Sequence, residues 1–269
     1  MRRLIIRPGA IGDCILALPA IEHLRTDFFE VWLPSHSVPL VRLGAPVRPI
    51  ATTGLDLLGI PDREPPAGLR ECLAGFDEIV SWYGSANADF RGAVAGLPFR
   101  FLAARPDERA RLHAADFFLA QAGGAGPAIP RIECPRWPGG FAVIHPFSGS
   151  ARKNWPLERY RELARLLATP LPVAWCAGPD DELEGAVCFD DLYELACWLG
   201  GASLYVGNDS GITHLAAAVG TPVVALFGPT DPAVWAPRGP HVRVVATARP
   251  GEAMEEIPVG SVFEAATVP

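Results

Sequence analysis

Short apolar runs alternate with segments of helical periodicity along the first half of this chain. The runs predict strands, and the segments between them predict helices. The predicted strands are Leu4–Arg7, Val31–Leu33, Val47–Ala51, Glu78–Trp82 and Arg100–Ala103, and the predicted helices are Asp13–Arg25, Gly84–Ala95 and Glu108–Ala122. Because this alternation is typical of βαβ units, it predicts an α/β fold with a parallel sheet.

The second half repeats the same alternation. Its predicted strands are Phe141–Ile144, Val173–Cys176, Val187–Phe189, Leu204–Val206 and Val223–Phe227, and its predicted helices are Pro156–Leu167, Asp191–Leu199 and Gly211–Val219. Spaced apolar residues in the tail, Met254 to Ala266, predict a closing helix. Each half is therefore predicted to be a doubly wound sheet that binds its ligand at the carboxyl ends of the strands.

The segment 123–140 separates the two halves. It holds five glycines and four prolines and has little apolar periodicity, which is typical of a linker. We predict an N-terminal domain over 1–135, a second domain over 136–250 and a C-terminal segment over 251–269.

Composition narrows the class of protein. The chain has 269 residues, of which 49% are hydrophobic, and a net charge of −7, which disfavours a general nucleic-acid binder. Its six cysteines form no C-x-x-C pair, which favours free thiols in a reducing cytoplasm over disulfides or a zinc site. Arg7-Pro8-Gly9 interrupts the N-terminal apolar run too early for a signal peptide, and Gly220-Thr221-Pro222 splits the uncharged run 210–230. We predict no membrane-spanning helix.

The first polar segment, Arg7 to Asp13, follows the first predicted strand. Gly9, Ala10 and Gly12 form a loop that lets the backbone approach a ligand, and Asp13 lies near a helix N-terminus. Two interpretations of Asp13 stand with equal weight: a plain helix cap, or a general base at the end of a strand.

The second segment, His145 to Pro156, contains the sole lysine among the 23 basic residues, Lys153. Ser148, Gly149 and Ser150 precede it and offer hydroxyls and an unobstructed backbone to phosphate oxygens. A chance lysine on a solvated helix start is the alternative, and Trp155 is interpreted as a packing residue.

The third segment runs from Val206 to His214, from a buried strand into an Ala-rich helix. The free amides of Ser210, Gly211 and Ile212 at that helix start predict a diphosphate site. His214 could donate to the same anion or could be an ordinary helix histidine. A catalytic triad with Ser210 as the nucleophile is conceivable, but the sequence around Ser210 lacks the G-x-S-x-G motif of such serines.

These three segments, in this order, resemble glycosyltransferase family 9, the heptosyltransferases. The matching stretches are Arg7–Asp13 with Leu18-Pro19-Ala20, His145-Pro146 with Lys153–Tyr160, and Gly207–Ala218 running into Ala225–Pro232. The resemblance implies a GT-B architecture of two Rossmann-like domains facing a cleft, with the acceptor site in the first and the nucleotide-sugar site in the second. It implies an inverting, metal-independent enzyme that needs no cofactor and transfers heptose from ADP-heptose to the lipopolysaccharide core or a related glycan.

The resemblance also implies roles for residues. Asp13 matches the general base and Lys153 the lysine at the donor phosphates. Asp209, Ser210, Gly211 and His214 match the diphosphate motif, and Asp180, Asp181 and Glu182 compete for the ribose. The family implies a cytoplasmic protein with at most peripheral contact with the inner membrane.

The chain departs from the family at Phe147, where many relatives have glycine, and in its shorter first domain. Because the resemblance places the acceptor site in that domain, two alternatives stay open. One is a non-catalytic nucleotide-sugar-binding protein, and the other is a nucleotide-sugar hydrolase or epimerase on the same scaffold.

Overall fold

The computed structural model describes residues 1–169 and 171–267. The chain forms two compact units, the first made of Met1–Asp107 with Ala114–Ala128 and the second of Glu108–His113 with Ile129–Pro269. The short segment Glu108–His113 therefore belongs to the second unit, although the sequence analysis placed it in the first domain. The last two residues of the predicted segment 251–269 lie outside the described part of the chain.

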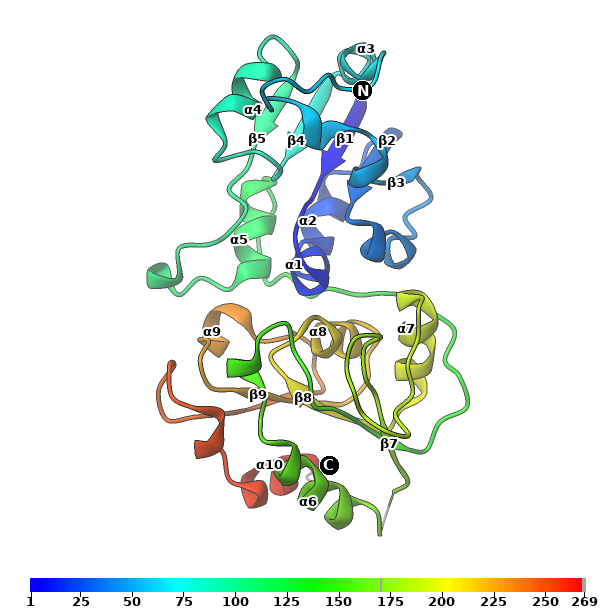
Figure 1. The fold of residues 1–269 in the computed structure, drawn as a ribbon, viewed down its shortest axis with the longest axis vertical. Coiled ribbons are helices and arrows are strands. Elements are labelled where there is room, and N and C mark those ends of the chain that lie inside the picture. Colours follow the sequence, from blue (N-terminus) through cyan, green and yellow to red (C-terminus); the bar gives the residue numbers. More distant parts are fainter. Residues whose placement is uncertain (170, 268–269) are drawn as a thin grey trace. The chain divides into compact units, whose positions relative to one another are not determined.

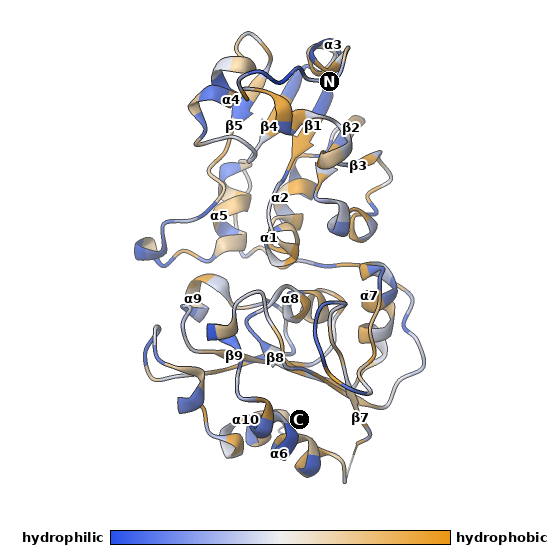
Figure 2. Ribbon diagram, in the orientation of Figure 1, coloured by the Kyte–Doolittle hydropathy of each residue, from blue (hydrophilic) through white to orange (hydrophobic). Residues whose placement is uncertain are grey.

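The first unit is built on a five-stranded parallel sheet (Figure 1). Its strands are β1 (Arg2–Ile6), β2 (Phe28–Leu33), β3 (Val47–Pro49), β4 (Glu78–Ser81) and β5 (Phe99–Phe101), in the order β3-β2-β1-β4-β5. In this register Ile6 lies opposite Trp32 of β2 and Ser81 of β4. Leu4, Ile5 and Ile6 of β1 are completely buried, as expected for a strand covered on both faces, and Figure 2 shows β1 as hydrophobic beyond its first residues.

The helices of the first unit are α1 (Ile11–Leu16), α2 (Leu18–His23), α3 (Leu69–Ala74), α4 (Ala88–Ala93) and α5 (Ala114–Gln121). The continuous helix predicted over Asp13–Arg25 is wrong, because the segment breaks at Ala17. The Ala17 amide donates to Cys14 O at 3.2 Å, three residues back, and Pro19 has no amide hydrogen to continue the helical pattern.

The helix predicted over Glu108–Ala122 is also interrupted. A short 3-10 turn covers Glu108–Ala110, and α5 begins only at Ala114. Between them Arg111 adopts φ 48°, in the left-handed region that ends a right-handed helix. The helix predicted over Gly84–Ala95 is shorter than expected, since only Ala88–Ala93 is helical.

The second unit carries its own five-stranded parallel sheet. Its strands are β6 (Ala142–His145), β7 (Val173–Trp175), β8 (Leu204–Asn208), β9 (Val223–Phe227) and β10 (Val242–Ala246), in the order β10-β9-β8-β6-β7. The strand predicted over Val187–Phe189 is wrong, because its sheet contact is a single bridge between Val187 and Cys176. The edge strand β10 was not predicted, since Arg243 interrupts its apolar run.

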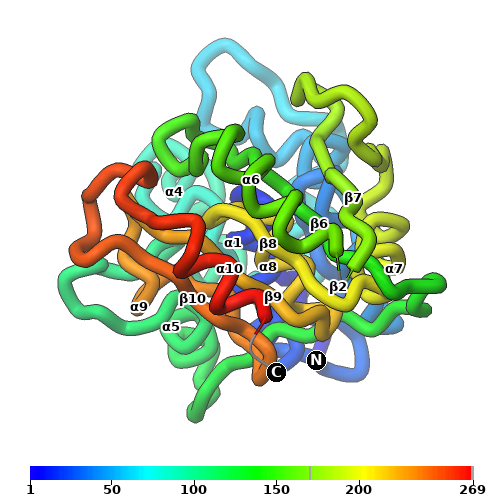
Figure 3. The backbone as a smooth tube through the Cα atoms, turned by 90° about the horizontal axis from the view of Figure 1, so that it is seen from below, coloured from blue at the N-terminus to red at the C-terminus, as the bar shows by residue number. Residues whose placement is uncertain are grey.

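The helices of the second unit are α6 (Leu157–Leu167), α7 (Leu192–Gly201), α8 (Gly211–Ala218), α9 (Pro232–Trp235) and α10 (Val259–Thr267). α6 and α10 lie side by side on one face of the sheet (Figures 1 and 3). Leu204 and Val206 of β8 join their core, together with Leu163 of α6 and Val262 of α10. The predicted closing helix is thus present and packs within the second unit.

The strand orders place the polar loops of the sequence. In the first sheet the winding reverses between β1 and β4, and in the second it reverses between β6 and β8. Ligands of doubly wound folds bind beyond the carboxyl ends of strands at such reversals. All three polar segments follow β1, β6 or β8, so each lies at a reversal. The predicted α/β class with two doubly wound parallel sheets is confirmed.

Within the described residues, no helix has the length and apolarity required to cross a bilayer.

Candidate functional site

Asn208, the last residue of β8, ties together the two loops at the reversal of the second sheet. Its side chain is completely buried. Its amide group donates to Pro146 O at 2.8 Å, and its Oδ1 accepts from the Trp155 amide at 3.0 Å and from the Tyr160 hydroxyl at 2.9 Å. Asn208 was not among the predicted site residues, because an amide at the end of a strand carries no periodic signal of the groups that it contacts.

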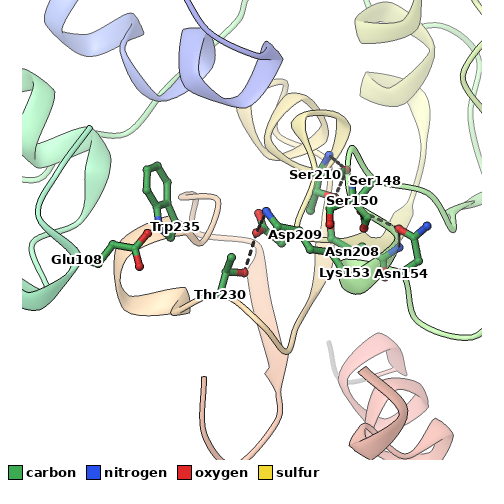
Figure 4. Close-up of polar contacts among 11 residues, drawn as sticks. Glu108, Ser148, Ser150, Lys153, Asn154, Asn208, Asp209, Ser210, Thr230 and Trp235 are labelled. Atoms are coloured by element: carbon green, nitrogen blue, oxygen red, sulfur yellow. Dashed lines mark hydrogen bonds and ion pairs between the residues drawn. The ribbon is translucent and has the colours of Figure 1, made fainter. Parts of the chain in front are cut away.

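Lys153 and Asp209 form an ion pair between these two loops (Figure 4). Lys153 Nζ lies 2.6 Å from Asp209 Oδ2, and the Thr230 hydroxyl donates to the same oxygen at 2.8 Å. Asp209 is nearly buried, whereas the Lys153 side chain is 29% exposed. The ammonium is therefore held by a carboxylate, while the side chain that carries it is still partly exposed to solvent.

Ser210 caps the N-terminus of α8. Its Oγ accepts from the Thr213 amide at 3.3 Å, and Thr213 in turn donates its hydroxyl to Asn208 O. The first-turn amides of a helix have no partner within the helix, so those of Gly211 and Ile212 are available at this end. His214 lies in the same turn and is buried.

Residues 146–156, between β6 and α6, form the loop that carries Lys153, here called the lysine loop. Its two serines, Ser148 and Ser150, contact each other and the loop backbone. Ser148 Oγ lies 2.8 Å from Ser150 O and 2.7 Å from Asn154 Oδ1 (Figure 4). Ser148 thus holds the loop in shape, whereas Ser150 has an exposed side chain. Their predicted contacts with donor phosphates stay predictions.

The acidic segment after β7 offers three carboxylates. Asp181 Oδ2 accepts from the Gly178 amide at 2.9 Å and so closes the local turn. Asp180 and Glu182 are exposed. All three follow the carboxyl end of β7, the neighbour of β6 in the sheet, and the assignment of the ribose contact to Asp180, Asp181 or Glu182 stays a prediction.

His145 is the last residue of β6 and directly precedes the lysine loop. Its ring stacks on Tyr205 with centroids 6.4 Å apart, and its Nδ1 is buried without a hydrogen-bond partner. Burial lowers the pKa of His145 to about 4, so the ring is neutral at pH 7. The His145 ring is thus a neutral packing group at the end of β6.

The segment Glu108–His113 lies against α9, which follows Thr230. The Trp235 indole donates to Glu108 Oε1 at 3.1 Å, and Arg111 Nε lies 3.5 Å from Asp231 Oδ2 (Figure 4 shows the former contact). His113 Nε2 is 2.8 Å from Ala236 O. These contacts of Glu108–His113 with the segment 231–236 were not expected from the sequence.

Asp13 lies at the start of α1 in the first unit. The N-cap of α1 is Ala10, so Asp13 is not the cap itself; it is the third residue of the helix, and its Oδ2 accepts from the Ala10 amide at 3.0 Å. Of its side chain, 23% stays exposed. Gly9 has φ +119°, and a Cβ there would lie 2.7 Å from the Asp13 Cβ. Gly9 therefore leaves the space that the Asp13 side chain occupies. The second interpretation of Asp13, as a general base, stays a prediction.

Among the described residues, no group of three or more His, Cys, Asp or Glu side chains is arranged to hold a metal ion. The positive groups near the reversal of the second sheet are instead Lys153 and the amides at the start of α8.

Residues 128–258, which carry the ion pair and the capped helix, match the model of "Glycosyltransferase family 9 (heptosyltransferase)". This part of the chain is therefore similar to a glycosyltransferase family 9 domain. Lipopolysaccharide heptosyltransferase 1 of Escherichia coli O18:K1:H7 is 30% identical over 137 residues, which is 46% of this chain and 41% of that protein. The chain thus aligns with less than half the length of this relative.

Two solved structures extend the likeness to the fold of the first unit. The ADP-heptose lipopolysaccharide heptosyltransferase II of E. coli is 20% identical, with a TM-score of 0.74 over 98% of this chain and 97% of the other. The E. coli heptosyltransferase WaaC with ADP gives the same identity and TM-score over 98% of both chains. At this identity the likeness concerns the fold, and it supports the predicted GT-B architecture.

Proposed function

We propose that this protein is a glycosyltransferase that moves heptose from ADP-heptose to a hydroxyl of the lipopolysaccharide core or a related glycan. The observation that carries the proposal is the Lys153–Asp209–Thr230 arrangement beside the start of α8, within the family 9 domain. The names of the relatives, lipopolysaccharide heptosyltransferase and ADP-heptose heptosyltransferase, support the choice of donor and acceptor.

The donor diphosphate binds at the reversal of the second sheet. Lys153 contributes a charge, and the amides of Gly211 and Ile212 contribute hydrogen bonds at the helix N-terminus. Asp209 does not bind the diphosphate through its carboxylate, since both are negative; it holds the Lys153 ammonium in place. As the glycosidic bond breaks, these groups stabilise the charge that develops on the leaving ADP.

The acceptor hydroxyl is deprotonated by Asp13 in the first unit. Transfer proceeds with inversion, because the hydroxyl attacks the face of the sugar opposite the departing diphosphate. No metal is required in this scheme, since Lys153 and the α8 amides supply the positive charge. Exclusion of water from the reacting sugar would protect it from hydrolysis.

We place the reaction in the cytoplasm, where the protein has at most peripheral contact with the inner membrane. The net charge of −7 disfavours nucleic acid as a partner, and the partners are the nucleotide sugar and a glycan or glycolipid.

Donor binding is tested first by thermal shift with ADP, UDP and GDP. A ligand that binds the native state raises the melting temperature, so we expect a rise with ADP alone. Lys153→Met should weaken this shift, and Arg152→Met, at the exposed neighbouring position, serves as the matched control. An equal shift with UDP would contradict the choice of donor.

Transfer is tested with ADP-heptose and lipopolysaccharide that lacks heptose. We expect a heptosylated product, loss of transfer in Asp13→Asn, and ADP binding unchanged in that variant. ADP release with free heptose and no transfer product would instead support a hydrolase. Binding of ADP-heptose without turnover would support the non-catalytic alternative.

A further inference from the structure

Arg7, the first residue after β1, is a buried cation that the proposed mechanism does not use. Its side chain is 1% exposed, and it ranks among the largest fully buried side chains of the described chain. The guanidinium carbon lies 4.4 Å from the ring centroid of Phe118 and 5.7 Å from that of Trp82. Because a buried charge is costly unless it is compensated, this placement requires specific partners.

Those partners converge on Asp13. Arg7 Nε and Nη2 donate to the main-chain oxygen of Asp13 at 3.2 and 3.1 Å, and Nη2 lies 3.6 Å from Asp13 Oδ1. Nη1 donates to Ala104 O at 3.4 Å. The Asp13 carbonyl is open to this contact because α1 ends early, with the Ala17 amide bonded to Cys14 O instead.

The carboxylate of Asp13 is thus held from two sides. The Ala10 amide binds Oδ2 at 3.0 Å, and the Arg7 guanidinium lies beside Oδ1. A carboxylate has about four lone-pair positions, so acceptor capacity remains on the exposed part of the side chain. One buried side chain therefore contacts both the backbone and the functional group of the same residue.

We propose that Arg7 is the positioning residue for the base, holding the Asp13 backbone and carboxylate in one orientation toward the acceptor hydroxyl. This inference rests on the proposed function, in which Asp13 is that base. The planar fork of arginine can bind a carbonyl through two nitrogens and still reach a carboxylate, and the single ammonium of lysine cannot reproduce this geometry. The aromatic rings of Phe118 and Trp82 fix the plane of the fork.

A double-mutant cycle on the full chain separates positioning from packing. The variants are Arg7→Met, Arg7→Lys, Asp13→Asn and the Arg7→Met/Asp13→Asn pair, assayed with ADP-heptose and heptose-deficient lipopolysaccharide. Arg3→Met is the matched control, since Arg3 lies on β1, the strand that leads to Arg7, and binds Glu78 and Leu24 O away from Asp13. All rates are taken below the melting temperature of each variant.

If Arg7 acts through Asp13, Arg7→Met lowers kcat by about 10²-fold, the usual effect of misplacing a catalytic group. The KM for ADP-heptose should not change, because Lys153 and α8 lie in the other unit. Arg7→Lys should recover part of the loss, and Arg7→Met should cost nothing further in the Asp13→Asn background. Arg3→Met should lower the melting temperature without lowering kcat.

Two results overturn the inference while leaving the proposed function in place. One is an equal loss from Arg7→Met in both backgrounds, which would show a purely structural role. The other is a normal kcat for folded Arg7→Met, which decides the matter even when Asp13→Asn is inactive. Full activity of Asp13→Asn would instead remove Asp13 as the base, and so would reject that part of the proposed function.

Discussion

Replacement of Asn208 by alanine tests whether one buried amide holds the donor loops together. The substitution removes three buried hydrogen bonds, to Pro146 O, the Trp155 amide and the Tyr160 hydroxyl, and a longer, partly buried one to Asn154 Oδ1. Each buried group left without a partner costs about 1–3 kcal/mol, so the free energy of unfolding of the second unit should fall by at least about 3 kcal/mol. Native-state hydrogen exchange of the peptide around Trp155, measured against urea, reports this unit directly.

Tyr160→Phe is the matched control for this experiment. It removes one donor to the same Oδ1 and leaves the other two buried bonds, so it should cost about 1 kcal/mol. Asn208→Ala should also weaken ADP binding, because the lysine loop loses its tie to β8. A loss of stability in Asn208→Ala no larger than that in Tyr160→Phe would refute the reasoning.

The remaining predictions concern charge, backbone and pH. Lys153→Met should weaken ADP binding by about tenfold, the usual scale of a charge-assisted contact, whereas Arg152→Met should leave the dissociation constant unchanged in calorimetric titration. Gly9→Ala places a methyl group against Asp13 at φ +119° and should cost about 1–3 kcal/mol in urea unfolding; unchanged stability would contradict the strain argument. Burial lowers the pKa of His145 in the folded protein from 6.5 to about 4. Between these two pH values the unfolded chain therefore binds more protons at His145 than the folded protein does. Stability should therefore fall as pH drops from 6.5 toward 4, by on the order of 3 kcal/mol, and His145→Phe should remove most of that slope in thermal melts; an unchanged slope would contradict this assignment.

Local patterns predicted the strands well where a run was apolar throughout. β8 and β9 are buried at every position, and both were expected from their sequence. The errors arose where tertiary context decides. Val187–Phe189 looks like a strand but contributes a single bridge, and β10 carries Arg243 yet pairs along β9 as an edge strand.

The candidate site shows the same division. Lys153, Asp13 and the start of α8 stood out because each follows a predicted strand with residues suited to anion or proton chemistry. Asn208 and Arg7 did not stand out, since their importance lies in what they contact. An amide inside a strand and an arginine after one carry no periodic signal that would reveal three buried hydrogen bonds or a clamp on Asp13.

The sequence by itself determined the alternation of strands and helices and placed a polar loop after each of three strands, because hydrophobic periodicity is a local property. Only the tertiary structure decided that β6 and β8 are neighbours, which brings Lys153 and Asp209 into contact across 56 residues of chain. The contact of the Arg7 guanidinium with Asp13 and that of Glu108 with Trp235 of α9 were likewise visible only in the tertiary structure. Strand order and buried polar pairing depend on contacts between distant segments, and these follow from how whole sheets bury their faces.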